Sequence, residues 1–458
     1  MTASGVASAS FAAGVKGSPQ PELKPFLIGT SNSSGGAVAI EPDGSLVVVY
    51  GVSGGNGKTR VCVLARGKAA CSHTTTLTPL SNDDTFGAPQ VFIPSSNHVE
   101  VLQGACCDAN PLGGDVMYSS TNGGVSFGAP VRVGSIGVAS AMLLGSHIVF
   151  AGTDGNRPNV ESLPVGASGP SPTATLPQTE VTTVALGHYR GGVLVASASL
   201  FSDYSTSVEY APAADSSNFG VASSYKKVAT FNHEDLLAMS GDALLTIQTT
   251  GKNLFEVRFF NGTSFGAAHA VPGLKEHTLG AWETIDQDPA GVTHVFVETN
   301  WTSPIYTLEE ASTANGSDWT GWTDLGNAIS STYFYAGLDC IGSGLVLGDG
   351  GSKAIGYPVL APQSVTFALS QTSIKRGHST IGRGKGSKAA AGRTIELQIA
   401  KGSLWYNVAS THESSSGAFS FTIKGSTVGT AHYRAVASDL AGYVQYGYSP
   451  ARTLTVTS

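Results

Sequence analysis

Charged residues are scarce in this chain of 458 residues: Asp, Glu, Lys and Arg make up 12% of it, about half of the roughly 25% typical of soluble domains. Helix-length stretches rich in Glu, Lys and Leu are missing, whereas Gly (58 residues), Ser and Thr are abundant. This composition disfavours a cytosolic α/β enzyme and indicates a secreted, extracellular all-β protein. Because the chain is too long for one ordinary hydrophobic core, at least two domains are expected.

Long apolar runs are also missing. No run reaches the roughly 18 residues that a membrane-spanning helix needs, so no membrane span is predicted. Residues 1–14 have the small-residue character found near a signal-peptidase site, but they lack the charged and apolar regions of a signal peptide. We therefore expect residues 1–20 to be a disordered or processed N-terminal segment of a mature secreted chain.

Positive charge is in deficit overall, and it is unevenly distributed. The net charge of −7 argues against nucleic acid as a partner. From Pro362 onward there are ten Lys or Arg and three Asp or Glu, a balance of +7, so the remainder has −14. The basic end has two interpretations: it contacts an anionic wall or glycan, or it is an exposed strand face dotted with Lys. Nothing in the sequence indicates an oligomeric state.

Cysteine is limited to five residues. Cys62 and Cys71 flank a plausible hairpin turn at residues 65–68, which predicts a cross-strand disulfide and an oxidising compartment. The adjacent Cys106–Cys107 pair is either a vicinal disulfide that walls a pocket or two reduced cysteines. Cys340 lies in an apolar run and is expected to be a buried free thiol. No zinc-binding pattern occurs, so no metal site or required cofactor is predicted, although Asp and Asn loops are compatible with structural calcium.

One short phrase recurs along the first three-quarters of the chain: a polar turn followed by one aromatic residue. Its copies are Ser120–Phe127, Asp215–Phe219, Asn261–Phe265 and Asn315–Trp319. The aromatic residues are 92, 46 and 54 residues apart, and the first spacing fits two periods of 46. A period in this range predicts a repeat architecture.

Strand-like runs separated by turn signals surround each copy. Seven runs occupy equivalent places: Leu46–Tyr50, Val99–Gly104, Ile148–Gly152, Val193–Ala198, Ala243–Gln248, Thr293–Val297 and Gly344–Gly348. Four short strands in each unit predict an all-β fold with a seven-bladed β-propeller over residues 21–361, and six or eight blades are the alternatives. Residues 25–29 are expected to supply the fourth strand of the last blade and close the ring.

From Pro362 onward the sequence pattern changes to strand-length runs that alternate apolar and polar residues. The segments Gly402–Trp405, Gly417–Phe421 and Ala431–Arg434 resemble the immunoglobulin-like modules appended to secreted bacterial enzymes. A small immunoglobulin-like β-sandwich is therefore expected over residues 362–458. The Cys–Trp–Cys signature of antibody domains is absent.

The phrase at 120–127 resembles the Asp-box, or BNR repeat, of the sialidase-type propeller superfamily, with Asn122 in place of Asp and Phe127 in place of Trp. The resemblance implies a turn between the third and fourth strands of a blade. In that turn an Asx side chain accepts backbone N–H bonds, Gly takes a positive φ, and the aromatic residue packs between sheets. It thus implies a fold rather than a chemistry.

A true sialidase is not expected. The Phe/Tyr-Arg-Ile-Pro sequence of that family is absent, and of the six arginines before residue 362 only Arg157 is predicted to lie at the propeller mouth. Related propellers include glycoside hydrolases, polysaccharide lyases and glycan-binding proteins, which implies a polysaccharide or glycan as the partner.

In propellers the ligand usually lies where the inner strands begin and the second strands end. The blade register places acids and aromatics there. Glycoside hydrolysis needs two carboxylates, roughly 5–9.5 Å apart depending on mechanism. The catalytic candidates are Glu234, Asp235, Asp84 and Asp108, and the substrate-binding candidates are His233, Trp282, Trp301, Arg157, Asp154 and Tyr335. Alternatively, Glu234 and Asp235 are solvated loop acids, and Asp154 with Arg157 forms a simple ion pair.

Three functions therefore stay open. The leading prediction is a glycoside hydrolase that acts on an extracellular or cell-wall polysaccharide through a carboxylate pair. The first alternative is a non-catalytic glycan-binding or surface-assembly protein. The second is a polysaccharide lyase, for which His233 with Tyr204 or Tyr335 is the best pair.

Overall fold

The computed structural model is an all-β structure in which strands predominate, and the described residues include the short 3-10 helix η2 (Ala222–Ser224). The chain forms two compact units, Lys24–Val359 and Met1–Leu23 with Leu360–Ser458. In the described residues no helix has the length and apolar character needed to cross a membrane. The structure describes residues 7–9, 15–16, 24–31, 35–52, 58–65, 67–78, 88–104, 115–134, 136–154, 156–167, 169–199, 205–214, 219–249, 254–272, 283–299, 306–328, 333–339, 342–350, 352–361, 363–387, 393–402, 404–438 and 447–458.

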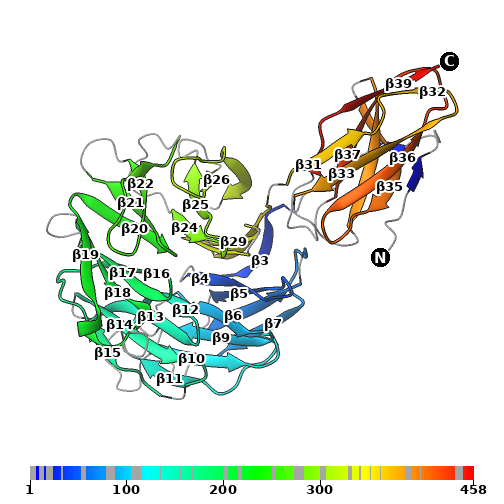
Figure 1. Cartoon of the computed structure of the whole chain (residues 1–458). Helices are drawn as coiled ribbons and strands as arrows, with labels where there is room; N and C mark the ends of the chain where they lie inside the picture. The colour runs from blue at the N-terminus through cyan, green and yellow to red at the C-terminus, as the bar shows by residue number, and fades with distance from the viewer. Residues whose placement is uncertain are drawn as a thin grey trace. The chain divides into compact units, whose positions relative to one another are not determined.

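The unit Lys24–Val359 is a seven-bladed β-propeller made of seven four-stranded antiparallel sheets (Figure 1). Strands are given in sheet order. Blade 1 contains β4 (Gly36–Ile40), β5 (Leu46–Gly51), β6 (Thr59–Leu64) and β7 (His73–Leu77), and blade 2 contains β8 (Gln90–Ser95), β9 (His98–Gln103), β10 (Asp115–Ser120) and β11 (Val131–Gly134). Blade 3 contains β12 (Val138–Leu144), β13 (His147–Asp154), β14 (Arg157–Pro164) and β15 (Thr173–Thr175), and blade 4 contains β16 (Thr183–Tyr189), β17 (Gly192–Ser199), β18 (Ser205–Ala211) and β19 (Lys226–Phe231).

Blades 5 to 7 repeat the arrangement. Blade 5 contains β20 (Glu234–Ser240), β21 (Ala243–Gln248), β22 (Phe255–Phe259) and β23 (His269–Ala270). Blade 6 contains β24 (Thr284–Gln287), β25 (Thr293–Thr299), β26 (Tyr306–Thr313) and β27 (Thr323–Ala328). Blade 7 contains β28 (Tyr333–Leu338), β29 (Gly344–Gly350), β30 (Lys353–Val359) and β3 (Phe26–Thr30). The first strands of successive blades contact one another, and β28 contacts β4, so the ring is closed. The predicted blade count, the seven second strands and the closing N-terminal strand are confirmed.

The second strand of a blade has neighbours on both edges and both faces, which explains its apolar sequence. Every position of β5, β17 and β29 is buried. The cores lie between adjacent sheets: one of them joins Val47 and Val49 of blade 1 to Val99 and Val101 of blade 2. Burial between blades therefore holds the ring together.

The recurrent turn connects the third and fourth strands of a blade, as predicted. In the turn after β26, Asn315 Oδ1 accepts hydrogen bonds from the backbone N–H groups of Ser317 (3.0 Å) and Asp318 (2.9 Å). Gly316 has a φ of 77°, and Trp319 packs against the core between blades 5 and 6. Asn122 and Asn261 accept equivalent bonds after β10 and β22. The copy at 215–218 lies outside the described residues. The turn is thus a structural clasp.

The Cys62–Cys71 disulfide is present, as predicted, and joins the third strand of blade 1 to the segment that leads into β7. Replacing both cysteines with serine is expected to lower the free energy of unfolding by about 2–3 kcal/mol, because the bond restricts a short loop of the unfolded chain. Urea unfolding of the double variant and the wild type under non-reducing conditions measures the difference. Equal unfolding midpoints would contradict the prediction.

The second unit is a two-sheet β-sandwich. One sheet contains β1 (Ala7–Ala9), β36 (Ala418–Lys424), β33 (Ser379–Gly386) and β31 (Val365–Leu369); the other contains β2 (Val15–Lys16), β35 (Leu404–His412), β34 (Thr394–Lys401), β37 (Gly429–Ala437), β39 (Arg452–Thr457) and β32 (Ser373–Lys375), with β38 (Gly447–Tyr448) beside β37. Apolar side chains of both sheets share one core. The N-terminal segment, expected to be disordered or processed, contributes β1 and β2 to this unit.

Candidate functional site

A cavity of about 300 Å³ lies among the inner strands of the propeller. Its lining comes from the first strands of five blades: Ala37, Val38, Gln90, Val91, Phe92, Ala141, Met142, Thr284, Ile285, Tyr335 and Ala336. The lining is mostly apolar, and Gln90, Thr284 and Tyr335 are its polar side chains. Tyr335 was predicted to lie at the mouth, and the structure places it in this lining.

Glu234 lies in a buried ion pair. Arg258 of β22 donates to both of its carboxylate oxygens, with Nη1 at 2.6 Å and Nη2 at 2.9 Å. Thr246 Oγ1 donates a third bond at 2.9 Å, and Arg258 Nη2 also contacts Glu256 at 3.1 Å. Glu234 is 8% exposed, so the alternative of a solvated loop acid is wrong for this residue. The geometry favours a structural ion pair over a free catalytic carboxylate.

Asp235 and His233 flank Glu234 and lie in different surroundings. Burial raises the pKa of the Asp235 carboxyl, opposed by a hydrogen bond from the backbone of Leu236. His233 is exposed, has a φ of 62°, and its carbonyl accepts from Thr249 N–H at 2.8 Å. His233 precedes blade 5 while Tyr335 belongs to blade 7, so the structure does not bring this predicted lyase pair onto adjacent blades.

Arg157 begins β14, is exposed, and is the strand partner of Asp154 at the end of the β13–β14 ladder. The ladder thus brings the two residues together, and the ion pair between them stays a prediction. The side chain of Asp154 lies outside the described part of the structure. So do several other predicted residues: Asp84, Asp108, Trp282, Trp301, Tyr204, Cys106, Cys107 and Cys340.

Asp349 and Tyr335 form a buried polar group where blade 7 meets blade 1. Gly35 N–H donates to Asp349 Oδ2 at 2.8 Å. Burial raises the pKa of Asp349, and the hydrogen bonds from Ser31 and Gly35 oppose that shift. Burial also raises the pKa of Tyr335, and the nearby Asp349 charge adds to this. Gly35 has a φ of 100°, and a Cβ there would lie 2.4 Å from Tyr335 Oη, so only glycine fits.

Two carboxyl groups of blade 6 were missed by the sequence reasoning. Glu283 directly precedes the inner strand β24 and is partly exposed; Glu298 lies near the end of β25 and is 1% exposed. Burial raises the pKa of Glu283 to about 8, and the charge of Glu298 contributes to the rise. Burial raises the pKa of Glu298 to about 7. The sequence signal that could have identified them is their proximity to Trp282 and Trp301, the predicted substrate-binding residues.

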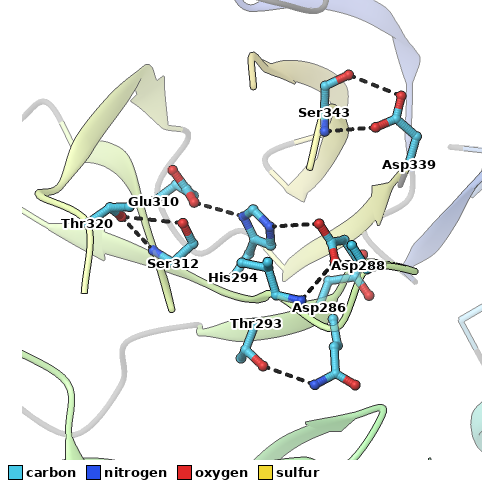
Figure 2. A network of polar contacts seen from close by, with 12 residues as sticks. Asp286, Asp288, Thr293, His294, Glu310, Ser312, Thr320, Asp339 and Ser343 are labelled. Carbon is cyan, nitrogen blue, oxygen red and sulfur yellow. Dashed lines mark hydrogen bonds and ion pairs between the residues drawn. The ribbon is translucent and has the colours of Figure 1, made fainter. Parts of the chain in front are cut away.

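A second polar network occupies the opposite end of blade 6 (Figure 2). His294 Nδ1 lies 2.9 Å from Glu310 Oε1, and its Nε2 lies 3.8 Å from Asp288 Oδ2. Burial lowers the pKa of His294, but the two carboxylates outweigh it and raise the value to about 9. Asp288 also accepts backbone bonds from Ala290 and Val292. The network therefore braces the β24–β25 turn, away from the predicted mouth.

No protein-family model and no curated protein matches the chain. Among solved structures it is similar to a hydrazine synthase of Kuenenia stuttgartiensis (11% identity, 72% of this chain, 96% of that chain, TM-score 0.47). It is also similar to polysaccharide lyase Uly1 (9%, 71%, 92%, TM-score 0.33) and to a neuraminidase-like protein from A/bat/Guatemala/164/2009 (11%, 75%, 93%, TM-score 0.38). Similarities this distant concern the fold alone.

Proposed function

We propose that this protein is a secreted glycoside hydrolase that cleaves an extracellular or cell-wall polysaccharide at the propeller mouth. The observation that supports it most is Glu283, a partly exposed carboxyl beside the cavity residue Thr284, with a pKa raised by burial to about 8. A carboxyl group that stays protonated at neutral pH can donate a proton to the departing glycosidic oxygen. Glu283 is thus assigned as the general acid.

The reaction also needs a carboxylate that acts on the opposite side of the sugar or activates water. Asp84 and Asp108 stay the leading candidates for it, with Asp235 as the third. Glu298 acts through Glu283: its negative charge raises the proton affinity of that carboxyl. Glu234 leaves the catalytic set because Arg258 occupies both of its oxygens.

Aromatic residues near these carboxyls suit a sugar substrate, because ring faces stack on sugar rings. Trp282 adjoins Glu283 in the sequence, and Trp301 follows Glu298 by three positions. Tyr333, at the start of β28, is 40% exposed. The remaining substrate contacts are assigned, as predicted from the sequence, to His233, Arg157, Asp154 and Tyr335.

The test is a screen of plant and bacterial polysaccharides for released oligosaccharides. Glu283→Gln is expected to reduce release by about 10²–10⁴-fold, and either Asp84→Asn or Asp108→Asn by a similar factor. Glu180→Gln is the matched control, because Glu180 is an exposed carboxylate that precedes the inner strand of blade 4. Full activity of Glu283→Gln would refute the assignment of Glu283 as the general acid. If no polysaccharide of the panel released oligosaccharides with the wild type, the hydrolase proposal would be refuted.

A non-catalytic glycan-binding protein is the second candidate, favoured by the ion pair that removes Glu234 from chemistry. Polysaccharide retention without product release would support it. A lyase is distinguished by unsaturated uronate products that absorb ultraviolet light, which a hydrolase does not form.

Three further assignments belong to the proposal. The Cys62–Cys71 disulfide supports secretion into an oxidising compartment. The recurrent turns support membership of the sialidase-type Asp-box superfamily. Pairing of β33 with β31 and β36, and of β32 with β39, supports an immunoglobulin-like sandwich. Structural calcium in the Asp and Asn loops is retained as a prediction.

A further inference from the structure

The larger sheet of the sandwich carries two aromatic rings and a cation on its outward face. The guanidinium carbon of Arg434 on β37 lies 4.3 Å from the ring centroid of Trp405 on β35 and 4.6 Å from that of Tyr448 on β38. Strand register explains the grouping, because Gln398 of β34 is directly opposite Arg434, and Val436 is opposite Tyr448. Residues opposite each other in an antiparallel pair share one face.

Buried polar contacts fix the orientation of the cation. Gln398 is 4% exposed; its Oε1 accepts from Arg434 Nε at 2.8 Å, and its Nε2 donates to Asn407 Oδ1 at 2.8 Å. Of the three side-chain nitrogens of Arg434, only Nε takes part in these bonds. Within the described residues, the terminal nitrogens of Arg434 have no hydrogen-bond acceptor, and the side chain is only partly buried. Two terminal nitrogens therefore stay available to an external acceptor.

The rings are available to a ligand as well. Tyr448 is 43% exposed, and Trp405 is partly exposed. Aromatic residues at such exposure on a sheet face form a platform for planar or ring-shaped groups. A guanidinium held against aromatic rings presents paired donors that match a carboxylate.

The charge of this part of the chain selects the ligand. Residues from Pro362 onward have a balance of +7, against −14 for the remainder. An anionic ligand is therefore attracted to the sandwich rather than to the propeller. Among the described residues, Arg434 supplies the one guanidinium of this face, and the carboxylate of Glu396 lies two positions from Gln398 on the same strand. Nucleic acid, which needs several phosphate contacts, fits this face poorly.

We propose that the Trp405–Arg434–Tyr448 face is a binding site for an anionic, uronate-containing polysaccharide. The rings stack on sugar faces, and Arg434 pairs with a uronate carboxylate. The site lies in a different unit from Glu283 and does not depend on catalysis. It would tether the full chain to a polyanionic glycan whichever activity the propeller has.

Affinity electrophoresis of the full chain through gels containing polygalacturonate tests the proposal. All variants are made in the Glu283→Gln background, so that cleavage does not consume the probe. Arg434→Gln, and Tyr448→Ala as a second variant at an exposed side chain, are each expected to weaken retardation by about tenfold. Arg383→Gln is the matched control, because Arg383 is an exposed arginine on β33 of the other sheet and its replacement removes the same charge.

Retained binding by Arg383→Gln together with loss by Arg434→Gln would support the site. Equal weakening by both would overturn it in favour of nonspecific charge attraction. Equal retardation by neutral dextran, or by single-stranded DNA, would overturn the assigned ligand class. Binding by the Glu283→Gln parent keeps this result separate from the success or failure of the hydrolase assignment.

Discussion

Replacement of Arg258 with leucine is expected to lower the free energy of unfolding by about 3–5 kcal/mol. The arginine lies between Glu234 and Glu256, and the side chains of all three are about nine-tenths buried. Its removal leaves two carboxylates in a low-dielectric environment with no counter-charge. Arg258 also stacks on Phe231 of the neighbouring blade, 4.7 Å from the ring centroid. The loss should therefore affect the interface between blades 4 and 5 as well as blade 5.

Urea unfolding at neutral pH measures the effect. A variant that combines Arg258→Leu with Glu234→Gln and Glu256→Gln is the matched control, since it removes the cation and both anions together. It should recover most of the lost stability, because a neutral replacement of a buried ion pair costs far less than breaking it. A loss below about 1 kcal/mol in the single variant would show that these carboxylates are solvated or protonated.

Stability is expected to fall as the pH rises above about 6.5, and His294 is the main cause. Its pKa is raised from 6.5 to about 9 in the folded protein. The stabilisation is therefore fully present below the unfolded pKa and is lost as the pH rises through 9. A shift of this size corresponds to roughly 3 kcal/mol. Burial also raises the pKa of Asp286 and of Glu298 to about 7 and that of Glu283 to about 8. These three carboxyl groups act in the same direction at lower pH, between about 4 and 8.

Unfolding free energies between pH 6 and 10 test this prediction. His294→Gln should be less stable than the wild type at pH 6 and should lose most of the decline above about pH 8, to which the three carboxyl groups contribute little. His432→Gln is the control, because His432 is exposed on the sandwich and its replacement should leave the slope unchanged. A wild-type curve that is flat between pH 7 and 9.5 would contradict the assigned pKa of His294.

The sequence was sufficient to predict the fold because each blade repeats the same local signals. The Asn122, Asn261 and Asn315 turns set the register, and apolar runs such as β17 identify the second strands. The closing strand β3 followed from the missing fourth strand of the last blade. Repetition makes such an inference robust, since an error in one blade does not move the others.

The candidate site was less predictable, because ionisation depends on contacts that are distant in the sequence. The sequence around Glu234 predicts an available acid, whereas in the folded chain Arg258, 24 positions away, donates to its carboxylate. Glu283 has no distinguishing sequence pattern, because its raised pKa comes from burial that no local pattern reveals. The Trp405–Arg434–Tyr448 face was hidden for the same reason: its three residues come from three strands.

The pH dependence of kcat/KM on a cleaved polysaccharide tests the central claim, that Glu283 is the general acid, most directly. The wild type should lose activity on the alkaline side with an apparent pKa near 8, the value for Glu283. Glu298→Gln removes the neighbouring negative charge and should move this limb to lower pH while retaining activity. Activity that persists unchanged beyond pH 9, or an alkaline limb that Glu298→Gln leaves in place, would contradict the assignment of Glu283.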